Sequence, residues 1–289
     1  MFRVRIDPIA GRRWRLRLGV LATSLCLAAT ASVAVTQSAT AAPATQPQPH
    51  NTIVPRPSHA APMASGGPLY SHGGPVQNAP AVYLLFWGFT SDPQGEESYL
   101  QSFLNHVGCT SWLKTVNQYG GGYCSIYKGA WADSSIPPTT PTDAQIQSEA
   151  LAFANYLGLS HSNVNAQLVI ATPTGHSTSG FGSSYCAYHG VVGGTSLSYT
   201  DLPYMSDAGY SCGWGSVTGS PEDGVSIVEG HELAEAITDP LLNAWYDANG
   251  SEIGDICAWT GLADINLNGS YFAMQPLWSN RANACVQSS

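Results

Sequence analysis

The chain has 289 residues, with 10 lysines and arginines against 19 aspartates and glutamates. Six arginines precede residue 18, so the chain after residue 41 carries four basic and eighteen acidic residues, a formal charge of −14. Binding to nucleic acid or to an anionic membrane depends on clustered positive charge. We therefore expect no nucleic-acid partner.

Residues 1–41 have the organisation of an export signal peptide. An arginine-rich start precedes an apolar run at 18–35, and Ala-Thr-Ala at 39–41 supplies the small residues of a cleavage site. The alternative is an uncleaved membrane anchor, but Thr and Ser dilute the apolar run and the cleavage pattern ends it. The sequence predicts a secreted, extracellular protein with no stable membrane anchor after cleavage.

Residues 42–75 are rich in Pro, Gln, Ala, Ser and Gly and contain few large apolar side chains. Such a composition is typical of a disordered or extended linker, because it buries too little apolar surface to fold. Residues 76–289 are numerous and apolar enough for one domain with a sizeable core. We expect this domain to be a monomer.

Hydrophobic periodicity predicts alternating strands and helices along this domain. In chain order, we expect a strand at 82–89, helices at 94–107, 110–119 and from Thr142 to about Tyr156, strands at 167–171, 185–192 and 197–202, a helix at 221–238 and a last strand at 271–277. This order favours an α/β or α+β fold, with helices flanking a mixed sheet.

Six cysteines follow residue 41, an even number in a chain destined for an oxidising compartment. Six cysteines allow fifteen pairings. The sequential pairing closes the shortest loops, and we predict it: Cys109–Cys124, Cys186–Cys212 and Cys257–Cys285. The absence of Cys-x-x-Cys disfavours a zinc site built from thiolates.

The helix at 221–238 carries the pattern His-Glu-x-x-Glu at 231–235. Residues four apart share a helix face, so His231 and Glu235 can hold one Zn²⁺ while Glu232 acts as a base for metal-bound water. The common metallopeptidase pattern has His at the last position, and Glu there makes the metal a weaker Lewis acid. The alternative is an inert amphipathic helix whose carboxylates face water.

A third ligand is expected from the acidic segment at 245–257. Asp255 is favoured because Gly254 allows close approach of the backbone and Cys257 can fix the segment. Glu252 is the alternative ligand.

Other residues near the motif allow competing interpretations. Asp247, Asn249 and Glu252 could form a small calcium loop, because Asp-x-Asn-Gly is a turn rich in oxygen ligands. His189 could reach the metal, although a histidine beside a disulfide is more often structural. Tyr246 could polarise a carbonyl group or belong to the core. The chain has no Gly-x-Ser-x-Gly, which disfavours a serine hydrolase.

The strings at 231–235, 240–246 and 252–257 resemble the core of the EXORDIUM-like (phosphate-induced protein) family and its bacterial secreted relatives. Segments 82–88 and 186–189 are similar to that family's Phe-Trp-Gly and Cys-Gly-Phe-His segments. The resemblance implies an extracellular, cell-wall or growth-associated protein with a zincin-like helix. The family has Asn where this chain has Asp239, which argues against Asp239 as an essential ligand.

These patterns predict a single zincin-like metalloprotease-type domain and a secreted zinc-dependent peptidase-like hydrolase. His231, Glu235 and Asp255 would hold zinc and Glu232 would be the catalytic base. The substrate would be a peptide or a cell-wall component. The alternative is a non-catalytic extracellular protein of the EXORDIUM kind at a cell wall or glycan surface, in which the same residues brace the fold or bind calcium.

Overall fold

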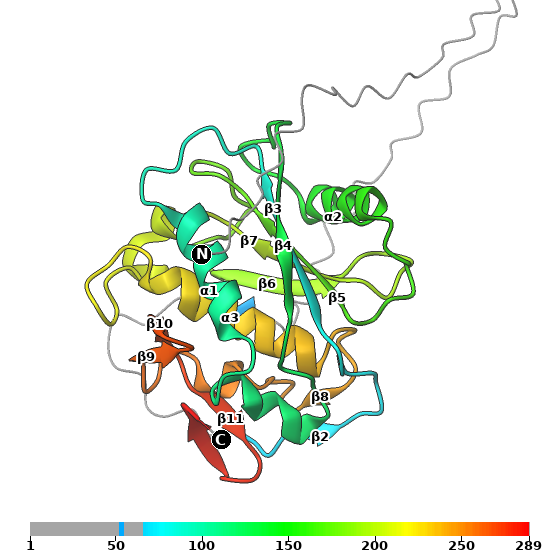
Figure 1. Ribbon diagram of the computed structural model, residues 1–289, viewed down its shortest axis with the longest axis vertical. Coiled ribbons are helices and arrows are strands. Elements are labelled where there is room, and N and C mark those ends of the chain that lie inside the picture. The colour runs from blue at the N-terminus through cyan, green and yellow to red at the C-terminus, as the bar shows by residue number, and fades with distance from the viewer. Residues whose placement is uncertain (1–51, 55–65, 289) are drawn as a thin grey trace, which may run out of the picture. The chain divides into compact units, whose positions relative to one another are not determined.

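The computed structural model describes residues 52–54 and 66–288 (Figure 1). The predicted signal peptide lies outside the described residues, as does most of the predicted linker. Within the described residues, no helix is both long enough and apolar enough to cross a membrane.

A six-stranded mixed sheet organises the fold, in the order β1-β6-β7-β5-β3-β4. Strands β4, β3, β5 and β7 are parallel, whereas β6 is antiparallel to β7 and β1 is antiparallel to β6. The central strand β5 is buried along its whole length, as expected for a parallel strand with both faces covered. The strands are β1 (Thr52–Ile53), β3 (Ala81–Trp87), β4 (Tyr127–Asp133), β5 (Ala166–Ala171), β6 (Ala187–Val191) and β7 (Ser198–Leu202).

Helices cover both faces of the sheet (Figure 1). Helix α2 (Asp143–Leu157) packs Ile146 and Phe153 on one face. Helices α1 (Glu96–Val107) and α3 (Asp223–Thr238) contribute to the hydrophobic core on the opposite face. All sixteen residues of α3 are buried, so the helix has no solvent-facing side.

The C-terminal elements explain why α3 is enclosed. The antiparallel pair β9 (Ala263–Leu267) and β10 (Ser270–Met274) contacts α3 through β10, while β6 contacts α3 from the sheet. The remaining elements are β2 (Tyr70–Ser71) paired with β8 (Trp245–Tyr246), β11 (Leu277–Ser279) paired with β12 (Ala284–Val286), and the 3₁₀ helices η1 (Leu113–Tyr119), η2 (Met205–Cys212) and η3 (Asp255–Cys257).

The mixed sheet with flanking helices confirms the predicted α/β class. The finer assignment to a zincin-type domain stays a prediction. Strand β4 was not predicted, because it is an edge strand whose residues are all partly or fully exposed and it lacks an apolar run. The predicted strand at 271–277 divides into β10 and β11 around Pro276, whose missing N–H interrupts a ladder. The last strand is therefore β12.

Part of the predicted linker at 42–75 is ordered. Strand β1 adds to the sheet beside β6, where the Cys186 N–H donates to the Ile53 carbonyl over 2.8 Å. The Ile53 side chain is completely buried. The amino-acid composition does not indicate this short strand, because only backbone hydrogen bonds and one buried side chain hold it in place.

The three predicted disulfides are confirmed: Cys109–Cys124, Cys186–Cys212 and Cys257–Cys285. Disulfides of this kind are consistent with an oxidising, extracellular environment. In the chain that begins after residue 41, thiol titration of denatured, unreduced protein should find essentially no free thiol. Detection of two or more reactive thiols would show that at least one bridge does not form.

Candidate metal centre

Helix α3 places acidic side chains in the interior. Glu229, His231, Glu232 and Glu235 are all completely buried, so the interpretation in which the helix carboxylates face water is wrong. A buried carboxylate is costly unless hydrogen bonds, a positive charge or a proton compensates it. The buried carboxylates of α3 therefore need such compensation from groups around them.

The three residues that the sequence predicts as zinc ligands lie together. His231 Nε2 is 2.9 Å from Glu235 Oε1 and 3.5 Å from Asp255 Oδ1, and one ligand atom from each residue lies within 4.8 Å of the others. Although 2.9 Å is short, Nε2 has no hydrogen-bond partner of suitable geometry in the described part of the chain. Ligand atoms about 2.1 Å from a tetrahedral Zn²⁺ lie on the order of 3.4 Å apart, so the separations suit one ion.

Backbone and amide groups orient these ligands. The N–H groups of Gly254 and Asp255 donate to Glu235 Oε1 over 3.2 and 3.1 Å. The Gln275 side-chain amide lies 3.1 Å from His231 Nδ1. The same amide nitrogen donates to the Gly254 carbonyl over 3.0 Å, which holds the amide in this orientation.

The segment that carries Asp255 is tied to the C-terminal strands. Asp255 begins η3, and Cys257 at the end of η3 is bonded to Cys285 in β12. The Trp278 N–H of β11 donates to the Ile253 carbonyl over 2.9 Å. These links place Asp255 against α3 although it is 20 residues away from Glu235.

A second histidine reaches the same carboxylates from the sheet. His189 on β6 places Nδ1 3.4 Å from Glu232 Oε2 and 3.8 Å from Glu235 Oε2. One ligand atom of each of these three residues lies within 4.8 Å of the others. His189 was expected to be structural because it lies beside a disulfide. In the structure its ring faces the carboxylates of α3.

Two further predicted candidates border this group. Glu252 Oε2 lies 3.8 Å from His189 Nε2 and has no hydrogen-bond partner among the described residues. Asp239 Oδ1 accepts from the N–H groups of Asn243 and Ala244 over 2.6 and 2.7 Å. Asp239 therefore holds the turn that follows α3.

The other candidate residues are engaged elsewhere. Asp247 Oδ1 accepts from the N–H groups of Asn249 and Ser251, forming the turn expected at this point, whereas Glu252 reaches His189. This arrangement does not favour the calcium loop. The ring of Tyr246 on β8 stacks on His72, the residue after β2, with 3.6 Å between ring centroids.

Sequence reasoning overlooked Glu229 and Gln275. Both carboxylate oxygens of Glu229 are buried without a hydrogen-bond partner in the described structure. Glu229 lies three residues before Glu232, and such spacing on one helix face is a signal that could have identified it. No local pattern marks Gln275, because it meets His231 only in the folded chain.

Burial and repulsion between neighbouring carboxylates raise the pKa values of several carboxyl groups in this cluster. Burial raises the pKa of Glu235 to about 7; the Asp255 charge adds to the rise and His231 opposes it. Burial also raises the pKa of Glu229 and Glu252 well above the usual range. Burial lowers the pKa of His231, but Glu235 and its neighbours outweigh that effect and the net shift is strongly upward. Without a cation, burial therefore favours the protonated forms of Glu229, Glu235 and Glu252.

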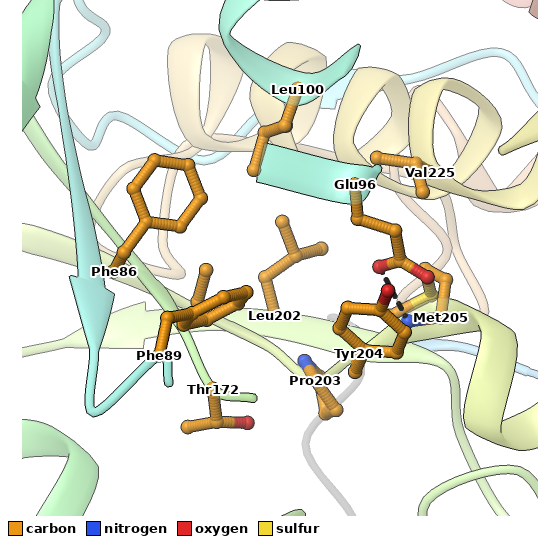
Figure 2. A pocket seen from close by; sticks show the side chains of 11 residues that line it. Phe86, Phe89, Glu96, Leu100, Thr172, Leu202, Pro203, Tyr204, Met205 and Val225 are labelled. Atoms are coloured by element: carbon orange, nitrogen blue, oxygen red, sulfur yellow. Dashed lines mark hydrogen bonds between the residues drawn. The ribbon is translucent and has the colours of Figure 1, made fainter. Parts of the chain in front are cut away.

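A separate small cavity lies on the α1 side of the sheet (Figure 2). Phe86, Leu100 and Leu202 contribute to its lining, and the Glu96 carboxylate accepts from the Met205 N–H beside it. Its volume is about 10 Å³, enough for about one water molecule. It has no room for a substrate and includes none of the candidate metal ligands.

Comparison with known proteins finds a plant relative. The chain is 26% identical to Protein EXORDIUM-like 5 of Arabidopsis thaliana over 247 residues, covering 70% of this chain and 67% of the relative. No family model and no solved structure matches the chain.

Proposed function

Because the chain is a relative of the EXORDIUM-like proteins, we propose that it is an extracellular protein of that kind whose helix α3 holds zinc. His231, Glu235 and Asp255 would be the protein ligands. One imidazole and two carboxylates form a donor set that Zn²⁺ accepts. The observation that carries the proposal is the buried convergence of these atoms, with His231 Nε2 lacking a hydrogen-bond partner among the described residues.

The burial of the ligands favours a bracing role over an open catalytic centre. His231 and Glu235 are completely buried, and the Asp255 side chain is 17% exposed. Structural zinc sites are closed by four ligands, whereas catalytic sites with three protein ligands keep the fourth position open for water and substrate. The bracing role therefore requires a fourth ligand beside the three named here. In the bracing role, the ion would join α3 to η3 and stabilise a surface that acts at a cell wall or glycan.

Asp255 supplies the direct test of this proposal. Asp255→Ala should reduce bound zinc by one equivalent per chain, because it removes one of three protein ligands. Glu252→Ala should leave that equivalent in place, as should Asp264→Ala, which alters an exposed carboxylate on β9. Zinc measured by mass spectrometry on the purified variants decides the matter. If Glu252→Ala loses the ion and Asp255→Ala keeps it, the ligand assignment is reversed.

A peptidase-like hydrolase is the second candidate function, and the position of Glu232 favours it. Glu232 is completely buried, and its Oε1 has no hydrogen-bond partner in the described residues. In such an enzyme the zinc would polarise the substrate carbonyl, while Glu232 would take a proton from water and pass it to the leaving amine. Wild-type protein would then cleave casein, and Glu232→Gln would retain zinc while losing cleavage. A zinc-loaded wild type that leaves casein intact would count against this candidate.

A further inference from the structure

We propose that the interior cluster binds a second divalent cation, through His189, Glu232 and Glu235, and that Glu235 bridges the two ions. The inference rests on the proposed zinc site for its first ion. The second ion has its own ligands and its own histidine, contributed by the sheet.

The two oxygens of Glu235 face different imidazoles. Oε1 lies 2.9 Å from His231 Nε2, and Oε2 lies 3.8 Å from His189 Nδ1. Glu232 Oε2 approaches the same His189 nitrogen at 3.4 Å. A carboxylate with one oxygen directed to each of two imidazoles is placed to bridge two ions, which lie about 3.5–4 Å apart in two-metal sites.

Among the described residues, the three carboxylates within 4 Å of His189 each have a buried oxygen without a hydrogen-bond partner. These oxygens are Glu232 Oε1, Glu235 Oε2 and Glu252 Oε2. An ion held by His231, Glu235 Oε1 and Asp255 would leave Glu232 Oε1 without a partner and Glu232 Oε2 with the His189 ring as its partner. An ion beside His189 would engage Glu232 and Glu235 and would lie near Glu252, which is 3.8 Å from the far nitrogen of the ring.

The balance of charge also favours two ions. Six carboxylates gather around two imidazoles in this region: Glu229, Glu232, Glu235, Asp239, Glu252 and Asp255. The lysines and the arginine of the described residues, Lys114, Lys128 and Arg281, are all exposed. One dication balances two carboxylates, whereas two dications balance four. Protons on the two remaining carboxyl groups would then be enough to neutralise the cluster.

The ligand set indicates which ions fit. One nitrogen and carboxylate oxygens suit zinc, and they also suit manganese, which accepts more oxygen ligands. The probes are therefore zinc alone and manganese alone, each added to metal-stripped protein that begins after residue 41 and then removed by desalting.

The test is the number of ions per chain, measured by mass spectrometry against protein concentration. Wild type should retain two, and His189→Ala and Asp255→Ala one each. Glu235→Gln should retain fewer than one because it alters both sites. His161→Ala, which changes an exposed histidine, should retain two. His189→Gln, which preserves polarity and volume, should match His189→Ala and guards against a folding defect in the smaller variant.

The outcomes separate the two proposals. Wild type with one ion that Asp255→Ala loses and His189→Ala keeps would overturn the second site and leave the zinc proposal standing. Wild type with no ion would overturn both. If manganese fills both positions, the electron paramagnetic resonance spectrum should show two coupled ions in wild type and an isolated ion in His189→Ala.

Discussion

Replacing Gly254 by alanine should lower zinc affinity by at least about tenfold, in the range seen when groups that orient metal ligands are disturbed. A Cβ at this position would lie 2.7 Å from Nδ1 and 2.8 Å from Cγ of His231. The backbone φ of −84° is one that alanine adopts readily, so the effect comes from contact with the ring. Overpacking of this kind costs about 1–3 kcal/mol, and here it displaces a ligand.

The matched control is Gly193→Ala. Its Cβ would meet Gln147 Oε1 at 3.5 Å, an ordinary contact, and the position is exposed. Affinity is measured by competition with a chromophoric chelator. Wild-type affinity in Gly254→Ala would show that the His231 ring is not where the zinc proposal needs it.

Chelator-treated protein should become less stable as the pH rises from 5 to 8. The pKa of Glu235 is raised to about 7 in the folded chain, so the folded state holds its proton more tightly than the unfolded state does. Stability is then lost as pH rises from about 4.5 to 7. The raised pKa values of His189 and His231 act in the same direction: their contribution is complete below about 6.5 and is lost as pH rises through the folded-state pKa.

The expected effect of pH is large. Glu235 alone contributes on the order of 3 kcal/mol, and the melting temperature should fall by on the order of 10 °C between pH 5 and 8. Zinc should reverse the trend, because it binds the deprotonated ligands and its stabilisation grows with pH. Calorimetry of stripped and zinc-loaded protein tests both statements, with Glu235→Gln expected to flatten the stripped curve. Stripped protein that gains stability from pH 5 to 8 would contradict this account of the cluster.

The local part of the site could be predicted from the sequence. His231 and Glu235 lie one helical turn apart, so helix geometry alone brings them together. Asp255 was also predictable, because Gly254 and the bridged Cys257 restrict the segment that carries it. The disulfides followed from an even count and short loops.

The contacts between distant segments at the site could not be predicted from local sequence patterns. His189 meets Glu232 because β6 is antiparallel to β7 and lies beside α3, and no spacing in the sequence encodes that neighbour. The complete burial of α3 depends likewise on β10, which is more than 30 residues farther along the chain. Sequence reasoning therefore identified one possible ion site and named His189 as a residue that could reach the metal, but it could not place His189 against Glu232.

Diffraction from zinc-loaded crystals on both sides of the zinc absorption edge tests the central claim most directly. The account predicts an anomalous peak about 2.0–2.2 Å from His231 Nε2 and from carboxylate oxygens of Glu235 and Asp255. The result that would contradict it is zinc bound only at surface histidines, with no anomalous peak among these three side chains.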